Sequence, residues 1–139
     1  MNKIFFPKHK KAKILIIDDE QDVCESLKSI LEKTGRFDVW ASTDAFEGIS
    51  LVESQHPDLI LLDIVMPEID GTEVAERLQN NEAAKDIIIV FTSVLADTEE
   101  VKENKGLIGG RPFISKPIKK DDLIARIESL LSERAAADK

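Results

Sequence analysis

Runs of large aliphatic residues divide the chain at regular intervals. They read KILII at 13–17, LILL at 59–62, IIIVF at 87–91 and, in a shorter form, FIS at 113–115. Near-continuous runs of this kind indicate strands that are covered on both faces, as in a parallel sheet. A fifth segment, FDVWA at 37–41, alternates apolar and polar residues, as an edge or half-covered strand does. The pattern therefore predicts five strands.

The segments between these strands carry apolar residues at helical spacing. The four stripes are Val23, Leu27, Ile30 and Leu31; Phe46, Ile49, Leu51 and Val52; Val74, Ala75 and Leu78; and Leu123, Ile124, Ile127, Leu130 and Leu131. The segment 97–105, DTEEVKENK, contains one aliphatic residue and predicts only a short, exposed helix. Five strand–helix repeats predict an α/β fold: a (βα)5 doubly wound, five-stranded parallel sheet flanked by helices, with right-handed crossovers.

Composition sets the class of protein and its size. The chain has 139 residues, of which 42% are hydrophobic and 33% charged, a balance typical of one globular domain rather than of disorder. We expect a folded domain at 13–132, a basic N-terminal leader at 1–12 and a C-terminal tail or start of a linker at 133–139. The net charge of −8 argues against affinity for nucleic acid or anionic membranes, so we expect no direct nucleic-acid binding.

The cellular compartment follows from the cysteine and from the N-terminus. The single cysteine, Cys24, has no partner for an internal disulfide and falls in a helical pattern, where we expect it to be packed. The N-terminal MNKIFF is too short for a signal-peptide core or a membrane span. We therefore expect no membrane insertion and a cytoplasmic protein.

Polar residues follow four of the predicted strands at their carboxyl ends. They are Asp18-Asp19-Glu20 after the first, Asp63 after 59–62, Thr92-Ser93 after 87–91 and Lys116-Pro117 after 113–115. In an open parallel sheet, ligands bind outside the carboxyl ends of the strands, where the strand order reverses. We therefore expect these side chains to share one edge of the sheet.

The chemistry of this set indicates phosphoryl transfer. Carboxylates gathered at one point repel one another unless a cation lies between them, and a hard cation such as Mg²⁺ suits oxygen ligands and phosphate. Lys116 is placed to face the same anion, Thr92 to donate to a phosphate oxygen, and Asp63 to act as a nucleophile. Taken singly, each has a simpler interpretation, since Asp18-Asp19 and Thr92-Ser93 are also common helix caps.

Four motifs resemble those of one known family. ILIIDDE, LLDIVMPEIDG, FTS and FISKP are similar, in this order, to the motifs of the receiver domain of bacterial two-component response regulators, which has a flavodoxin-like, chemotaxis-regulator-like fold. The resemblance covers Lys13 to Leu131. It implies that 13–132 is a receiver domain, a phosphoacceptor signalling module that catalyses only its own phosphorylation and dephosphorylation.

The resemblance also implies roles for the acidic residues. Asp63 would be the phosphoacceptor, taking a phosphoryl group from the phosphohistidine of a histidine kinase or a histidine phosphotransfer protein. Asp19 and Asp63 would ligate Mg²⁺, with Mn²⁺ as an alternative ion. Asp18 would act through water, and the backbone carbonyl of Val65 would complete the protein ligands.

The resemblance also implies a conformational switch that follows phosphorylation. Lys116 would contact the phosphoryl group, and its peptide bond to Pro117 would be cis. Thr92 would move toward the phosphate, and Phe113 would turn inward in response. The changed surface, around 97–105, the last strand and the last helix, would bind an unidentified downstream protein target, with the receiver a monomer or a phosphorylation-dependent dimer.

The chain departs from the family pattern in one region. Gly109-Gly110-Arg111-Pro112 stands where the family usually has Gly-Ala and then acidic or small residues, and 97–105 lacks the customary alanines. Two glycines and a weak apolar stripe predict mobility here. We expect this face to bind a partner different from the commonest one.

Several other functions compete with this one. A phosphohydrolase of the haloacid dehalogenase type needs a second aspartate two residues after the nucleophile, where this chain has Val65. A flavodoxin-like FMN protein needs a phosphate-cradling loop after the first strand, and Asp18-Asp19-Glu20 would repel the phosphate. A pseudo-receiver scaffold, independent of phosphorylation, remains an alternative, as does the N-terminal receiver domain of a larger protein with an absent effector.

Overall fold

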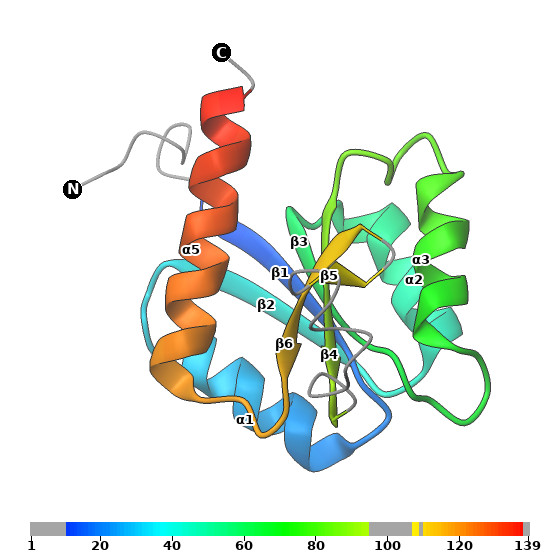
Figure 1. The fold of residues 1–139 in the computed structure, drawn as a ribbon, viewed down its shortest axis with the longest axis horizontal. Coiled ribbons are helices and arrows are strands. Elements are labelled where there is room, and N and C mark those ends of the chain that lie inside the picture. The colour runs from blue at the N-terminus through cyan, green and yellow to red at the C-terminus, as the bar shows by residue number, and fades with distance from the viewer. Residues whose placement is uncertain (1–10, 95–106, 109, 138–139) are drawn as a thin grey trace.

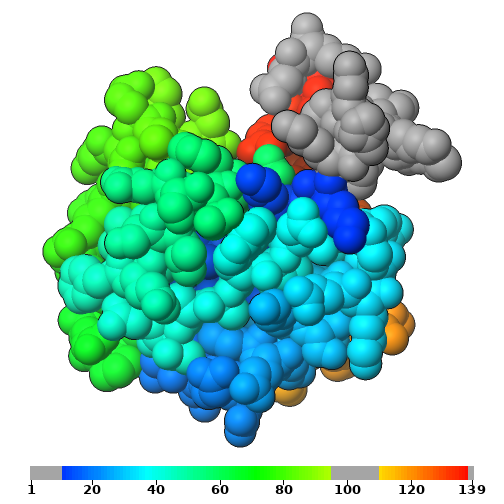
Figure 2. All heavy atoms as spheres, turned by 180° about the vertical axis from the view of Figure 1, so that it is seen from behind, coloured from blue at the N-terminus to red at the C-terminus, as the bar shows by residue number. Residues whose placement is uncertain are grey.

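A sheet lies between two layers of helices in the computed structural model, which describes residues 11–94, 107–108 and 110–137 (Figure 1). The strands are β1 (Ala12–Ile17), β2 (Phe37–Ser42), β3 (Leu59–Asp63), β4 (Ile88–Ser93), β5 (Leu107–Ile108) and β6 (Arg111–Ser115). The helices are α1 (Gln21–Glu32), α2 (Ala45–Gln55), α3 (Gly71–Gln79) and α5 (Lys120–Ala137). Viewed from behind, the surface is formed mostly by the first half of the chain (Figure 2).

The strand order is β2-β1-β3-β4-β6-β5. The first five of these strands are parallel, which confirms the predicted five-stranded parallel sheet. The two-residue β5 adds an antiparallel edge next to β6 that the sequence did not predict. The chain reverses its direction of travel across the sheet between β1 and β3, so the carboxyl ends of these neighbours form the topological switch point.

The side chains of β1 alternate between the two faces of the sheet, and both faces are covered. Ile14 and Ile16 belong to a buried cluster with residues of α1 and α5, whereas Leu15 and Ile17 belong to a second cluster with residues of α2 and α3. β3 is buried along its whole length. Burial of each large aliphatic side chain stabilises the fold by roughly 1.5–3 kcal/mol. The aliphatic runs are therefore the source of the sheet's rigidity.

Several boundaries differ from the prediction, three of them by two residues or more. β4 continues through Thr92 and Ser93, because these residues pair with Ile114 and Ser115 of β6. β6 begins at Arg111, where the antiparallel pairing with β5 starts. α5 includes residues 133–137, which the sequence analysis placed in a tail. The predicted helix at 97–105 and Gly109 lie outside the described residues, as do residues 1–10 of the leader expected at 1–12, whose last residue, Ala12, belongs to β1.

The last helix is attached to the amino-terminal edge of the sheet. The Arg134 guanidinium donates to the backbone oxygens of Asp58 (3.1 Å) and Asp86 (3.2 Å) and to Oδ1 of Asp58 (3.1 Å). Oδ2 of Asp58 accepts from the backbone N–H of Lys13 at 2.8 Å. Asp58 therefore joins β1, β3 and α5 at the edge opposite the strand ends that carry the candidate site. Among the described helices, none is long and apolar enough to cross a membrane.

Candidate functional site

Three carboxylates meet at the switch point. Asp18 follows β1 and Asp63 ends the neighbouring β3, with Ile17 and Leu62 paired just before them. Asp18, Asp19 and Asp63 each offer an oxygen, and these oxygens lie within 4.8 Å of one another. Asp18 and Asp63 are buried and Asp19 is exposed, so the cluster opens to solvent on one side. The structure thus brings together the acidic residues that the sequence predicted.

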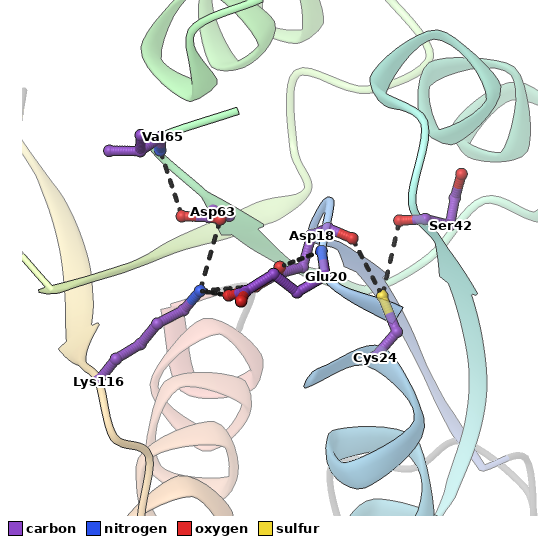
Figure 3. Close-up of polar contacts among 7 residues, drawn as sticks. All are labelled: Asp18, Glu20, Cys24, Ser42, Asp63, Val65 and Lys116. Atoms are coloured by element: carbon purple, nitrogen blue, oxygen red, sulfur yellow. Dashed lines mark hydrogen bonds and ion pairs between the residues drawn. The ribbon is translucent and has the colours of Figure 1, made fainter. Parts of the chain in front are cut away.

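Asp18 is held through both its backbone and its side chain (Figure 3). Its N–H donates to the carbonyl oxygen of Ser42 at 3.1 Å, and its own carbonyl accepts from the Cys24 thiol at 3.2 Å. Oδ1 accepts from the backbone N–H of Glu20 at 2.9 Å, and Oδ2 lies 2.9 Å from Nζ of Lys116. Asp18 is therefore a fixed negative charge beside Asp63.

Asp63 is 4% exposed and has fewer partners than Asp18. Oδ1 accepts from the backbone N–H of Val65 at 3.2 Å, and Oδ2 lies 3.4 Å from Nζ of Lys116. Burial and, second, the charge of Asp18 raise the pKa of Asp63 to about 6, although Lys116 and the Val65 N–H act in the opposite direction. The lysine alone therefore does not offset the cost of burying the ionised carboxylate.

Lys116 is shared between three acids. Its Nζ lies 2.9 Å from Asp18, 3.4 Å from Asp63 and 3.7 Å from Glu20. Burial lowers the pKa of Lys116, but the hydrogen bonds and charges of Asp18 and Asp63 outweigh this effect, and the net pKa lies above its ordinary value. Lys116 is consequently a permanent cation at the site. Its peptide bond to Pro117 is cis.

Thr92 lies directly beside Asp63, because the two residues pair across β3 and β4. The Thr92 carbonyl accepts from the N–H of Ile64 at 3.1 Å, and the side chain is 1% exposed. Phe113 lies one strand further, on β6, opposite Phe91. It is half-buried against the cluster on the α2–α3 side of the sheet, so the structure does not bring it into contact with the carboxylates.

The simpler interpretation of the first acidic motif, helix capping, does not account for the contacts. Glu20 is the N-cap residue of α1, but its side chain makes no capping hydrogen bond. Within the described part of the chain, the Asp19 carboxylate has no hydrogen-bond or ion-pair partner, and Asp18 contacts Lys116. By contrast, the Asp44 and Asp70 side chains do cap α2 and α3. The acidic motif therefore does not cap the N–H groups within α1, although Asp18 accepts from the N–H of the N-cap residue Glu20.

Sequence reasoning missed the role of Gly71. A Cβ at this position would lie 2.3 Å from the carbonyl oxygen of Asp63 and 2.7 Å from Cα of Ile64. The Gly71 N–H donates to the carbonyl of Ile64 at 2.8 Å, so the loop after β3 returns closely onto the strand end. The Asp70-Gly71 pair was the available signal, but it indicated a turn rather than a contact with the backbone of Asp63.

The donor set fits a hard divalent cation. Three carboxylates at one point supply oxygen ligands and excess negative charge, which such ions favour over soft ligands. The cluster Asp18, Asp19 and Asp63 is thus able to hold a metal ion. Lys116 lies on the same site and is suited to an anion bound beside that metal.

Comparison with known proteins identifies the family. The model of the response regulator receiver domain matches residues 14–128. The chain therefore belongs to the response regulator receiver domain family, the signalling domain of two-component systems. The five parallel strands and flanking helices are those of this family's fold.

Individual relatives agree with this assignment. The chain is 34% identical over 89% of its length to the alkaline phosphatase synthesis transcriptional regulatory protein PhoP of Bacillus subtilis, and covers 51% of it. It is 28% identical to protein PilG of Pseudomonas aeruginosa, covering 84% of this chain and 85% of that protein. A CheY-like receiver domain protein from Methanospirillum hungatei superposes with a TM-score of 0.79 at 28% identity, covering 92% and 99% of the two chains. The chain spans about half the length of several of its curated relatives, PhoP among them.

Proposed function

We propose that the protein is a phosphorelay receiver in which Asp63 accepts a phosphoryl group from the phosphohistidine of a histidine kinase or a histidine phosphotransfer protein. The observation that carries this proposal is the position of Asp63. It is a buried carboxylate at the end of β3, at the switch point of the sheet, beside a fixed anion, Asp18, and a fixed cation, Lys116, which contacts both acids. A carboxylate made basic by burial and like charge is a better nucleophile than a solvated one.

The transfer exchanges one bond to phosphorus for another. An oxygen of Asp63 attacks the phosphorus atom, a P–O bond forms and the P–N bond to the donor imidazole breaks. The imidazole nitrogen keeps the bonding electron pair and leaves as the neutral ring once it is protonated. Lys116 moves from its pairing with Asp18 and Asp63 toward the new phosphoryl oxygens, and Thr92 donates to one of them.

We further propose that the site binds Mg²⁺, with Mn²⁺ as a substitute. Asp19, Asp63 and the backbone carbonyl of Val65 would hold the ion directly, and Asp18 would hold it through water. Bound Mg²⁺ supplies positive charge that offsets the carboxylates and the phosphoryl oxygens. The fit rests on the three carboxylate oxygens that meet at this point.

The phosphorylated state would be transmitted through β4 and β6. Thr92 pairs with Ile114, the neighbour of Phe113, so a movement of Thr92 toward the phosphoryl group acts directly on β6. Phe113 is half-buried and lies opposite Phe91 across β4 and β6. The partner surface would comprise β6, α5 and the segment 97–105, where Gly110 and Arg111 depart from the family pattern.

The experiment is intact-protein mass spectrometry after incubation with acetyl phosphate, with and without Mg²⁺. We expect one added phosphoryl group on the wild type with Mg²⁺, and none on Asp63→Asn. Asp58→Asn, at the other end of β3, is the matched control and should be modified like the wild type. Modification of Asp63→Asn at the wild-type rate would contradict the assignment. If neither acetyl phosphate nor a phosphorylated histidine kinase modified the wild type, the proposed phosphoacceptor function would be wrong. A phosphorylation-independent scaffold would then be the better interpretation.

A further inference from the structure

Cys24 lies on the first turn of α1 and points away from solvent toward the ends of β1 and β2 (Figure 3). It is 3% exposed. Its Sγ lies 3.2 Å from the carbonyl oxygen of Asp18 and 3.8 Å from that of Ser42. The thiol proton is therefore directed at the nearer acceptor, the Asp18 carbonyl. This contact joins α1 to the loop that carries the acidic cluster.

The Asp18 carbonyl belongs to the peptide bond that leads to Asp19. On the other side of the same residue, the Asp18 N–H donates to the Ser42 carbonyl at 3.1 Å. The backbone is thus held from β2 before Asp18 and from α1 after it. The two peptide planes that flank Asp18 are each held by one hydrogen bond, and the second plane determines where the Asp19 side chain starts.

Asp19 depends on this backbone more than its neighbours do. Asp18 and Asp63 are each held through their carboxylates by Lys116 and by a backbone N–H. The Asp19 carboxylate is exposed and, in the described part of the structure, has no such partner. Nevertheless its oxygen lies within 4.8 Å of those of Asp18 and Asp63. Its place in the cluster is therefore set by its backbone and rotamer, and the peptide bond before it is the one that Cys24 contacts.

We propose that Cys24 is a positioning residue for the divalent-cation site: its thiol fixes the Asp18–Asp19 peptide bond and thereby holds the Asp19 carboxylate toward Asp63. The inference rests on the proposed function, because it concerns the Mg²⁺ site. Groups that orient metal ligands through hydrogen bonds typically change metal affinity about 10–100-fold when they are removed. An apolar residue of the same size would leave the Asp18 carbonyl without this donor and the peptide bond free to reorient.

The test compares Cys24→Val, which is apolar, slightly larger and without the donor, with Cys24→Ser, which keeps a donor. Leu27→Val is the control, because Leu27 is the next buried residue on the same helix and belongs to the core cluster. The dissociation constant for Mg²⁺ is measured by titration calorimetry on the full chain. The ¹³C shift of the Asp18 carbonyl, measured by NMR spectroscopy, reports the hydrogen bond itself.

We expect Cys24→Val to weaken Mg²⁺ binding about ten-fold and to shift the Asp18 carbonyl resonance. Cys24→Ser should stay close to the wild type in both measurements. Leu27→Val should lower the melting temperature and leave Mg²⁺ affinity unchanged. A Cys24→Val protein that failed to melt cooperatively would be replaced by Cys24→Ala, for which the same expectations hold.

Two results would overturn the inference and leave the proposed function intact. One is equal Mg²⁺ affinity in the wild type and Cys24→Val. The other is equal weakening in Cys24→Val, Cys24→Ser and Leu27→Val, which would show a packing effect only. A wild type that bound no Mg²⁺ would overturn both the inference and the proposed metal site.

Discussion

Two aspartates at opposite ends of β3 have opposite surroundings. Asp58, just before the strand, accepts hydrogen bonds from the Lys13 N–H and the Arg134 guanidinium at 2.8 and 3.1 Å. Asp63, the last residue of the strand, shares one lysine with Asp18, and Lys116 lies nearer to Asp18. One carboxylate has its own cation, and the other has a second carboxylate beside it.

The difference separates a stabilising edge of the sheet from the edge at which we propose the phosphoryl transfer. At the Asp58 edge, donors and opposite charge match the acceptors, so the contacts hold β1, β3 and α5 together. At the Asp63 edge, burial and like charge raise the pKa of the carboxylate from 3.8 to about 6. That shift corresponds to roughly 3 kcal/mol of disfavoured ionisation near neutral pH. A bound cation would offset this repulsion, so we expect the Asp63 edge to respond to metal ions.

Gly71→Ala gives the largest expected effect, since the added methyl group would collide with the Asp63 carbonyl and with Ile64. Neither backbone atom can move without displacing the end of β3. We expect the free energy of unfolding to fall by about 3 kcal/mol, as measured by urea denaturation. Gly48→Ala is the matched control, because its methyl group meets the side chain of Ile17 rather than backbone atoms. Equal losses of unfolding free energy in the two variants would show that the contact with the β3 backbone does not cause the effect.

Asp63→Asn should stabilise the metal-free protein at neutral pH. The carboxyl has a pKa of 3.8 when exposed and about 6 in the fold, so between these values the folded state binds more protons than the unfolded state. Stability therefore falls as pH rises from about 4 through about 6 and then levels off. We expect Asp63→Asn to lack this fall and to exceed the wild type by up to about 3 kcal/mol above pH 7 in EDTA. Near pH 4 the two proteins should be equally stable.

Asp58→Asn should change stability in the opposite direction. The substitution keeps the shape but removes the charge that Arg134 contacts, at a position about one-third exposed, 36% for the Asp58 side chain. Solvent weakens such a pair, so we expect a loss of about 1 kcal/mol or less. The loss should be the same with and without Mg²⁺, measured by urea denaturation. A stabilising Asp58→Asn would contradict the contrast between the two ends of β3.

Mg²⁺ should stabilise the wild type and leave Asp63→Asn nearly unchanged. At a free concentration ten times its dissociation constant, a ligand specific for the folded state adds about 1.4 kcal/mol. The gain should be largest above pH 6, where Asp63 is ionised in the fold. Melting curves with Mg²⁺ or EDTA measure it, with Asp58→Asn as a control that keeps the site. An equal gain in Asp63→Asn would place the ion elsewhere.

The sequence predicted those parts of the fold that depend on aliphatic runs and helical stripes. The general rule that ligands bind at the carboxyl ends of parallel strands also predicted the cluster of Asp18, Asp19 and Asp63. β5 was not predicted because two residues are too few to show a period. β6 was predicted too short because Arg111-Pro112 resembles a loop. The extension of α5 was missed because its contact through Arg134 is electrostatic rather than apolar.

The parts of the site that the sequence did not predict are contacts that form only when the loops after β1 and β3 fold back onto their strand ends. No local pattern shows that the Cys24 thiol is directed at the Asp18 carbonyl rather than into the core. Similarly, an Asp-Gly pair indicates a turn, and only the packed structure shows that Gly71 touches the backbone of Asp63. Sequence spacing locates the reactive groups, whereas their supporting contacts depend on the packing of α1 and α3.

The most direct test of the central claim locates the phosphoryl group. After reaction with acetyl phosphate and Mg²⁺, borohydride reduces an aspartyl phosphate to homoserine, and peptide mass spectrometry then identifies the altered residue. We predict homoserine at position 63, and none at position 18 or 19 in the same cluster or at position 58 on the same strand. Homoserine at position 18 or 19 in place of 63 would contradict the assignment of Asp63 as the phosphoacceptor.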